Sequence, residues 1–494
     1  MANIELYLKG HHKELQTIIL CIGSQFNPHK LQHFLLDVPI SNLIITGNLP
    51  ERKFNSIIKP VQDLIETGKL QTLNSLKYCT LQKLLSSNEL RPSTDFAIVF
   101  DNLDDNNDIL SLSNLRPKCL IGNVWYEDYI SAFSIWEHFR SVSSYINITT
   151  YRHNKEPQVL EWESNFNSNN VELSVIFPMY NVEQYLPACI ESVTKWKASY
   201  VEFLFVNDGS PDNSSKVIQQ YAQQDSRIKL LNKENGGCAS ARQYGFEHSS
   251  GRYVCFIDPD DFTDESMLRK LLRAALIGTY DISYCGYNEY YESNGDSSEV
   301  PDLLGCPYCD GTSDFNAILN LINYQRIGIW RTIFRTEMLH QNKIHFYTEL
   351  RRFDDLPFWA EATVSAKSVI AVPEHLYYYR LQRPGQDVSA DDERLYVHFD
   401  IFKFLDESLM SKKNQHLNDA LLVRKVATHK YALEKIKPDL MQEYAKQAKC
   451  DLKNMGSLFR SSLVLKKRCG MANVKCYFAI MSGNRFLLNH FFKK

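Results

Sequence analysis

Apolar and polar positions alternate along the first 150 residues in a pattern typical of a layered α/β domain. Short apolar runs that suit buried strands are separated by segments with apolar residues at helical spacing. The predicted strands are 17–23, 42–47, 70–73, 95–101 and 118–124, and the predicted helices lie near 30–36, 54–67 and 81–87. Neither a GxGxxG motif nor a P-loop is present in this region, so the pattern predicts a fold without assigning it a ligand.

A second, clearer series begins at residue 171. The stretch before it, 151–170, is polar and rich in Asn, which predicts a linker. Four apolar runs then alternate with helical patterns, at 173–177, 202–206, 227–231 and 253–257. Such a series predicts parallel strands whose carboxyl ends share one edge of a sheet, where ligands bind in open α/β folds. From 395 to 494 the pattern is helical.

Composition is that of an ordinary globular protein. The 494 residues exceed one hydrophobic core and predict about two to four domains. Hydrophobic residues at 44% and charged residues at 23% exclude collagen-like, coiled-coil and wholly disordered classes. No apolar run approaches the roughly 18 residues of a membrane span, and no leader-like stretch opens the chain. We therefore expect a cytoplasmic protein with reduced cysteines.

The net charge of -3 is unevenly distributed along the chain. Residues 451–494 hold nine Lys or Arg and one acidic residue, which gives +8, so residues 1–450 carry -11. Within this end, 458–494 mixes basic and large apolar side chains, a composition typical of segments that lie on an anionic membrane surface. The alternative is a helical cap with a solvated basic face. The acidic body argues against nucleic acid as a partner.

Residues with candidate chemistry follow three of the predicted strands. The first strand leads into 178–181 (PMYN), the second into 207–210 (NDGS) and the fourth into 258–261 (DPDD). Because parallel strands end at one edge, an aromatic ring and several carboxylates are expected to meet there. The set suits a nucleotide: Tyr180 packs the base, Asp208 accepts hydrogen bonds from base or ribose, and the later aspartates hold a divalent cation against a diphosphate.

These segments resemble the successive motifs of family-2 glycosyltransferases with the GT-A fold. The resemblance rests on VIFPMYN at 175–181, VNDGSPDNS at 206–214, NGGCASARQYG at 235–245 and FIDPDD at 256–261. Three downstream segments also fit: IWRTIFR at 329–335, FDDLPF at 353–358 and LYYYRLQRPGQDVS at 376–389. The last of them is similar to a segment of bacterial capsule and cell-wall sugar transferases. The match covers residues 171–390, and the occurrence of several motifs in the same order argues against a chance match.

The resemblance implies a role for each residue at the strand ends. Pro178, Tyr180 and Asp208 would hold the uridine. Asp258 and Asp260 correspond to the family's DXD pair, with Asp260 as the direct ligand of Mn²⁺ or Mg²⁺ and Asp258 nearer the ribose. Between them the family often has a small residue, whereas this chain has a proline that should stiffen the turn.

The downstream motifs imply the remaining roles. Where the family reads Glu-Asp, this chain reads Asp354-Asp355, so Asp355 takes the role of base and the shorter Asp354 that of contacting a sugar. Arg380 and Arg383 resemble lid residues that meet the diphosphate. Trp330 would stack on a sugar, with a place in the core as an equal alternative.

The sequence is compatible with two roles for Arg242, contact with a phosphate and pairing with a buried acid. The second role is favoured.

The resemblance thus implies a GT-A domain at 171–394, preceded by a small Rossmann-like domain at 1–150 and followed by a helical region at 395–494. One base and one cation imply an inverting transfer from a UDP-sugar to a glycan or lipid-linked acceptor in bacterial surface polysaccharide synthesis, at the inner face of the membrane. Two alternatives stay open. A sugar nucleotidyltransferase would need a Gly-rich, Arg-bearing loop after the first strand, and a non-catalytic nucleotide- or glycan-binding protein would carry the acids as relics.

Overall fold

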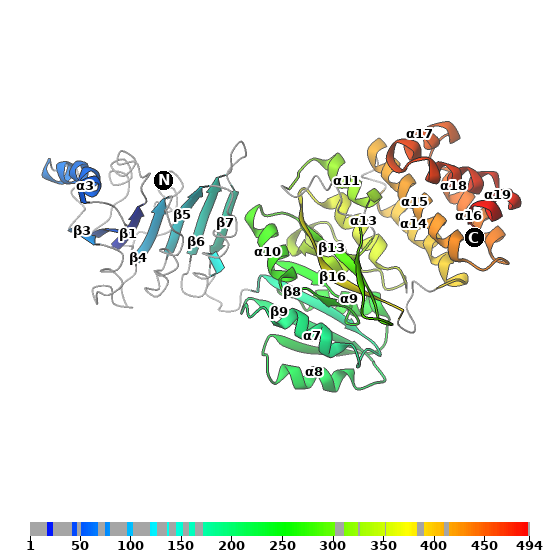
Figure 1. Ribbon diagram of the computed structural model, residues 1–494, viewed down its shortest axis with the longest axis horizontal. Coiled ribbons are helices and arrows are strands. Elements are labelled where there is room, and N and C mark those ends of the chain that lie inside the picture. The colour runs from blue at the N-terminus through cyan, green and yellow to red at the C-terminus, as the bar shows by residue number, and fades with distance from the viewer. Residues whose placement is uncertain are drawn as a thin grey trace. The chain divides into compact units, whose positions relative to one another are not determined.

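The chain divides into two compact units, residues 1–168 with 276–278 and residues 169–275 with 279–494 (Figure 1). The computed structural model describes most of the second unit, namely 171–275, 279–301, 311–324, 327–350, 352–382, 390–409 and 414–492, and also 276–278 of the first. In the first unit it describes the strands and one helix named below, together with residues 67 and 136–137.

The first unit is built on a seven-stranded sheet in the order β3-β2-β1-β4-β5-β6-β7. All neighbours are parallel except β6 and β7, which are antiparallel. The first six strands have the order typical of doubly wound dinucleotide-binding folds. The elements are β1 (Thr17–Ile22), β2 (Asn42–Thr46), α3 (Glu51–Glu66), β3 (Ser75–Cys79), β4 (Phe96–Asp101), β5 (Cys119–Trp125), β6 (Tyr145–Tyr151) and β7 (Gln158–Glu163).

Most of the strands predicted for this unit are present within two residues of their expected bounds. The third is not: β3 lies at Ser75–Cys79, and the predicted strand 70–73 falls outside the described residues, as do the predicted helices 30–36 and 81–87. The prediction also missed β6 and β7. Strand β7 occupies part of the expected linker 151–170, because its sequence QVLEWE supplies apolar residues that the polar composition of the whole stretch conceals.

The second unit contains a nine-stranded sheet in the order β10-β9-β8-β11-β15-β13-β16-β12, with β14 paired to β13. Strands β10, β9, β8 and β11 are mutually parallel, and β15 joins β11 in the antiparallel sense. The strands are β8 (Leu173–Met179), β9 (Val201–Asp208), β10 (Ile228–Lys233), β11 (Tyr253–Phe256), β12 (Phe262–Thr263), β13 (Ile282–Tyr291), β14 (Ser297–Glu299), β15 (Thr332–Arg335) and β16 (Val369–Leu381). The βαβ series expected from residue 171 onward is therefore present, and its carboxyl ends share one edge.

Three helices connect the parallel strands: α7 (Leu186–Thr194), α8 (Ser214–Ala222) and α9 (Cys238–Glu247). Helix α9 packs closely on the sheet, because Gly245 has no side chain there. A Cβ atom at Gly245 would lie 2.4 Å from Ile176 Cγ2 and 3.0 Å from Val206 Cγ2. This close packing fixes the distance of α9 from β8 and β9. That distance is important because α9 carries the buried Arg242, close to the residues at the strand ends.

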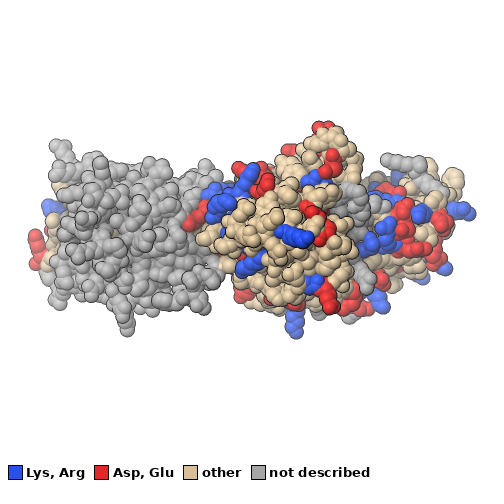
Figure 2. Space-filling view, turned by 90° about the horizontal axis from the view of Figure 1, so that it is seen from below, with Lys and Arg blue, Asp and Glu red and all other residues tan. Residues whose placement is uncertain are grey.

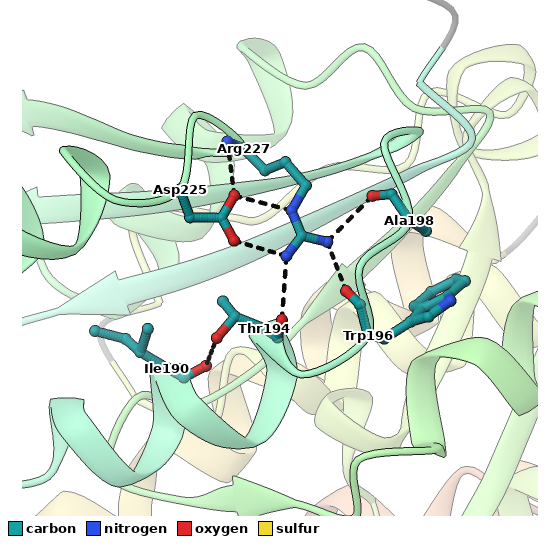
Figure 3. Close-up of polar contacts among 6 residues, drawn as sticks. All are labelled: Ile190, Thr194, Trp196, Ala198, Asp225 and Arg227. Carbon is teal, nitrogen blue, oxygen red and sulfur yellow. Dashed lines mark hydrogen bonds and ion pairs between the residues drawn. The ribbon is translucent and has the colours of Figure 1, made fainter. Parts of the chain in front are cut away.

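A half-buried arginine, Arg227, lies at the opposite, amino-terminal edge of these strands (Figure 3). Arg227, just before β10, pairs with Asp225 at 2.7 Å and donates to the carbonyl oxygens of Thr194, Trp196 and Ala198 at 3.2, 2.6 and 3.1 Å. Those carbonyls belong to the end of α7 and the loop after it, so one guanidinium satisfies groups that a helix end leaves without partners.

The helical region expected after 395 is confirmed, and it packs on a helix of the sheet domain. It consists of α14 (Val397–Ser408), α15 (Gln415–Lys435), α16 (Met441–Lys453), α17 (Leu458–Cys469), α18 (Met471–Ser482) and α19 (Arg485–Phe492). Helix α13 (Asp355–Ser365) lies between two cores. One of its sides, with Phe358 and Ala362, joins the core of the sheet, and the other, with Leu356 and Ala360, joins the core formed with α14 and α15.

The remaining helices are α10 (Met267–Ile277), α11 (Phe315–Tyr324) and α12 (Thr336–Gln341). None of the described helices is both long enough and apolar enough to cross a bilayer.

The tight contact at Gly245 gives a stability prediction. Gly245→Val forces a branched side chain into Ile176 and Val206, and overpacking of this kind should lower the free energy of unfolding by about 2–3 kcal/mol. Glu247→Val, at an exposed position of the same helix, is the matched control and should change it by less than about 0.5 kcal/mol. Urea denaturation of both variants measures the difference, and equal stabilities would contradict the packing.

Candidate active site

The aspartates that follow β11 form a tightly held turn. Asp260 and Asp261 are buried, and Asp261 accepts hydrogen bonds from the Tyr377 hydroxyl and the Arg380 backbone N–H, both at 2.7 Å. Burial, together with the charges of Asp260 and Asp258, raises the pKa of Asp261 well above its usual range. Asp261 therefore anchors the turn to β16, and the anchored turn positions Asp258 and Asp260.

The centre of the site is the buried guanidinium of Arg242, on α9. Arg242 Nη2 donates to Asp258 Oδ1 at 2.6 Å, and Nη1 donates to Asp354 Oδ2 at 2.8 Å. One side chain thus joins the turn after β11 to the residue before α13, although Asp354 is 112 positions away from Arg242 in sequence. The sequence favoured the pairing of Arg242 with a buried acid, and these contacts agree with that prediction. The structure adds a second acid.

Helix α9 is itself fixed by Asp208, the last residue of β9. Asp208 Oδ1 accepts from Gly236 N at 2.9 Å and from Lys233 Nζ at 2.6 Å, and Oδ2 accepts from Gly237 N at 2.7 Å. Gly237 has φ of +89°, a conformation that favours glycine, and it is the residue before α9. The Asp208 carboxylate therefore holds the turn from which the helix of Arg242 starts.

Tyr180 stands at the same edge, directly after β8, with 53% of its surface exposed. The next residue, Asn181, adopts φ of +56° and donates its backbone N–H to Ser210 Oγ at 2.8 Å, which ties the loops after β8 and β9 together. Pro178 lies within β8, two residues beyond the last pair with β11 (Ile176 with Phe256), so its missing N–H interrupts no ladder on that side.

Asp355 is the first residue of α13 and is partly exposed. Desolvation by the surrounding protein, with the nearby charges of Asp354 and Asp258, raises the pKa of Asp355 to about 7, while Arg242 acts in the opposite direction. A carboxyl group with such a pKa is ionised in part at neutral pH and binds a proton more strongly than an ordinary aspartate. It is suited to accept a proton from a hydroxyl group.

Arg380 lies in β16 rather than in a lid. Its Nε donates to the Asp260 carbonyl oxygen at 2.7 Å, its Nη1 pairs with Glu292, and its guanidinium lies 5.2 Å from the ring centroids of Tyr185 and Tyr290. The buried strand position and these partners differ from the expected contact with a diphosphate. Arg383, the second residue of that expectation, lies outside the described residues.

Trp330 is also buried, in a cluster of aromatic rings. Its ring stacks on Tyr377 and Tyr379, with centroids 4.2 and 5.4 Å apart, and meets Tyr287 edge-on at 4.9 Å. This arrangement favours the core reading of Trp330 over the sugar-stacking one. Tyr377 links this cluster to the acidic turn, because its hydroxyl binds Asp261.

Comparison with known proteins bears on this arrangement. Residues 174–332 match the model of the family described as Glycosyl transferase family 2. The chain carries a family 2 glycosyltransferase domain.

Individual relatives agree with this assignment. The glycosyltransferase EpsJ of Bacillus subtilis (strain 168) is 33% identical over 210 residues, which cover 42% of this chain and 60% of EpsJ. The poly(ribitol-phosphate) beta-glucosyltransferase of Bacillus spizizenii is 25% identical over 225 residues, 44% of this chain and 34% of that protein. The match thus spans less than two thirds of the length of either relative.

Among solved structures, residues 1–349 of S. aureus TarS in complex with UDP-GlcNAc superpose with a TM-score of 0.54 at 18% identity, covering 65% of this chain and 91% of that one. At this identity the likeness concerns the fold, which confirms the GT-A class for the second unit.

The glycosyltransferase domain offers two carboxylates rather than a closed metal site. Among the residues described, no three His, Cys, Asp or Glu side chains are arranged to hold a metal ion by themselves. Mg²⁺ and Mn²⁺ do not require such a cage beside a diphosphate, because they are held by one or two carboxylates together with phosphate oxygens and water. Asp258 and Asp260, two positions apart in a fixed turn, fit that requirement.

Two charged residues that bind site residues of the glycosyltransferase domain were not predicted from the sequence. Lys233 binds Asp208, and Glu292 binds Arg380. Lys233 stands at the end of β10, so its position beside the strand-end residues is a signal that was available. Glu292 follows β13, and its closeness to β16 depends on a strand pairing that no local pattern predicts.

The bridge made by Arg242 gives a prediction for the glycosyltransferase domain. Arg242→Lys keeps the charge but offers no planar fork, so it should bind only one of Asp258 and Asp354 and lower the rate of UDP release from a UDP-sugar about a hundredfold. Arg227→Lys, at the opposite edge of the strands, is the matched control: it should lower the melting temperature while leaving that rate unchanged. Equal rate losses in the two variants would argue against a special role for Arg242.

Proposed function

We propose that this protein is an inverting glycosyltransferase that moves a sugar from a UDP-sugar to a hydroxyl group of a glycan or lipid-linked acceptor in bacterial surface polysaccharide synthesis. The observation that carries the proposal is the Arg242 bridge. It brings the turn of Asp258 and Asp260, on the donor side, next to the start of α13, where Asp355 lies.

The donor nucleotide is assigned to the edge formed by β8 and β9. The exposed ring of Tyr180 offers a face for a base, beside Pro178. A carboxylate has about four lone-pair directions, and the three bonds from Lys233, Gly236 and Gly237 leave Asp208 one with which to accept from base or ribose. TarS, which shares the fold, binds UDP and UDP-GlcNAc in its crystals, and this supports a uridine nucleotide as the donor.

Asp260 and Asp258 are assigned to Mn²⁺ or Mg²⁺, with Asp260 as the direct ligand. The ion, when bound, would offset the negative charge that develops on the departing diphosphate, so that this side of the reaction needs no proton donor. Arg242 keeps Asp258 in place, and its positive charge reduces the repulsion among the carboxylates of Asp258, Asp354 and Asp355. Arg380 supports the same turn by donating from Nε to the Asp260 carbonyl oxygen.

Asp355 is assigned the role of base. Its carboxylate would accept the proton of the acceptor hydroxyl while the hydroxyl oxygen attacks the anomeric carbon and the bond to UDP breaks. A single displacement of this kind inverts the configuration, so an α-linked UDP-sugar yields a β-linked product. A positioned base of this kind contributes typically ~10²–10⁴-fold to the rate. The relative from B. spizizenii is named a beta-glucosyltransferase, which agrees with this outcome.

Asp354 and Trp330 are assigned supporting roles rather than the sugar contacts first expected of them. The Asp354 carboxylate binds Arg242 and so holds the start of α13, and the Trp330 ring is covered by its neighbours. The name of one relative, poly(ribitol-phosphate) beta-glucosyltransferase, supports a polymer as the acceptor.

Replacing the base tests the proposal most simply. Asp355→Asn removes the proton acceptor with little change of shape, so the rate of transfer should fall at least a hundredfold while UDP binding, measured by calorimetry, stays within about twofold. The wild-type protein is first screened against a panel of UDP-sugars with Mn²⁺ present to find the donor. Wild-type protein that binds UDP but releases none from any UDP-sugar would point instead to a non-catalytic binding protein.

The raised pKa of Asp355 predicts the pH dependence. The base must be ionised, and its pKa is about 7, so kcat/KM should fall about tenfold for each pH unit below that value and level off above it. Asp355→Glu should retain part of the activity and shift the midpoint, because the longer side chain meets different surroundings. Carboxyl groups of raised pKa titrate between about pH 5 and pH 8. A kcat/KM that does not change over this range would contradict the assignment of Asp355 as the base.

A further inference from the structure

The last three helices expose an unusual set of apolar side chains. Of the seven large apolar residues that the described part of the chain exposes, six lie in α17, α18 and α19. The seventh is Tyr180, at the candidate site. The six are Leu458, Phe459, Leu463, Met471, Phe478 and Phe486, and both Phe459 and Phe486 expose 76% of their surface. Scattered single apolar residues are normal on a protein surface, but a concentration in one short segment indicates an interaction surface.

These residues are arranged on outward faces of folded helices. In α17, the exposed residues Phe459, Leu463, Lys466 and Lys467 follow at positions i, i+4, i+7 and i+8, opposite the buried Ser461 and Leu465. In α18, an outward stripe at positions i, i+4 and i+7 is formed in the same way by Met471, Lys475 and Phe478. The helices pack on one another and on the bundle core, so the apolar residues of the stripes are not there to fill that core.

The charge of this segment has one sign. Residues 458–494 contain eight Lys or Arg and no Asp or Glu. Elsewhere on the described surface acidic and basic side chains are intermixed, as Figure 2 shows for one face. Among the described residues, no carboxylate forms an ion pair with Lys466, Lys467 or Lys475, whereas Arg460 pairs with Asp419 of α15. The outward stripes therefore combine apolar rings with uncompensated positive charge.

We propose that α17–α19 form a docking surface for the anionic face of a lipid bilayer. A second copy of the chain is a poor occupant for this surface, because like charges would face one another with no acid to compensate them. A bilayer with anionic headgroups supplies both complements at once, since aromatic and aliphatic side chains enter the boundary of the acyl region while lysines reach the phosphates. The surface is separate from the residues assigned to transfer.

Sedimentation of the full-length protein with vesicles tests this surface. Wild type should sediment with vesicles of phosphatidylcholine and phosphatidylglycerol, bind little to phosphatidylcholine alone, and lose affinity as salt is raised. Lys466→Gln with Lys467→Gln should weaken binding about thirtyfold, since each basic residue near the surface contributes about fivefold. Phe459→Gln with Leu463→Gln should weaken it by at least tenfold. Lys195→Gln with Lys197→Gln, which removes two exposed lysines of the sheet domain, is the control and should bind as wild type does.

Other outcomes overturn the proposal. Absence of binding by wild type, or equal binding by all variants, excludes the bilayer as the occupant. A drop in molar mass of the Phe459 and Leu463 double variant by light scattering, without vesicles, would identify a second copy of the chain instead. Release of UDP from a soluble UDP-sugar is measured in parallel and should be the same for every variant, so failure of this surface is distinguishable from failure of the proposed transfer reaction.

Discussion

The candidate site depends on one guanidinium group. Arg242 is buried, and it can be charged there only because Asp258 and Asp354 supply two carboxylates in hydrogen-bonding geometry. The same two carboxylates would repel each other, and Asp260 and Asp355 as well, without a cation between them. The arginine therefore lets acids from two distant parts of the chain share one small region of the protein.

The rest of the second unit holds the parts of this bridge in position. Asp208 fixes the turn before α9, and the absence of a side chain at Gly245 lets α9 lie close to β8. On the other side, α13 is packed between the core of the sheet and the core formed with α14 and α15. The helical region after residue 395 thus has a structural role in the site: it supports the helix on which Asp355 lies.

Local patterns in the sequence predicted the parallel strands and the residues at their ends, because burial and strand spacing leave a strong signal. They did not predict the partners of those residues. Lys233 and Asp208 lie 25 positions apart, and Arg380 and Glu292 are 88 apart, so their contacts depend on the arrangement of strands. The lid role expected of Arg380 rests on a motif that says nothing of burial, whereas the side chain is buried in β16. Strand β7 has only three apolar residues among its six, and the polar residues around it conceal them.

The central claim is that the acids joined by Arg242 form a single donor and acceptor centre. A crystal structure of the protein with UDP and Mn²⁺ tests it directly, since the metal can be located by its anomalous scattering. The account predicts the ion between Asp260 and the diphosphate, the uracil ring beside Tyr180, and the Asp355 carboxylate facing the position of the missing sugar. Nucleotide and metal bound away from these residues, with the Arg242 bridge left undisturbed, would contradict it.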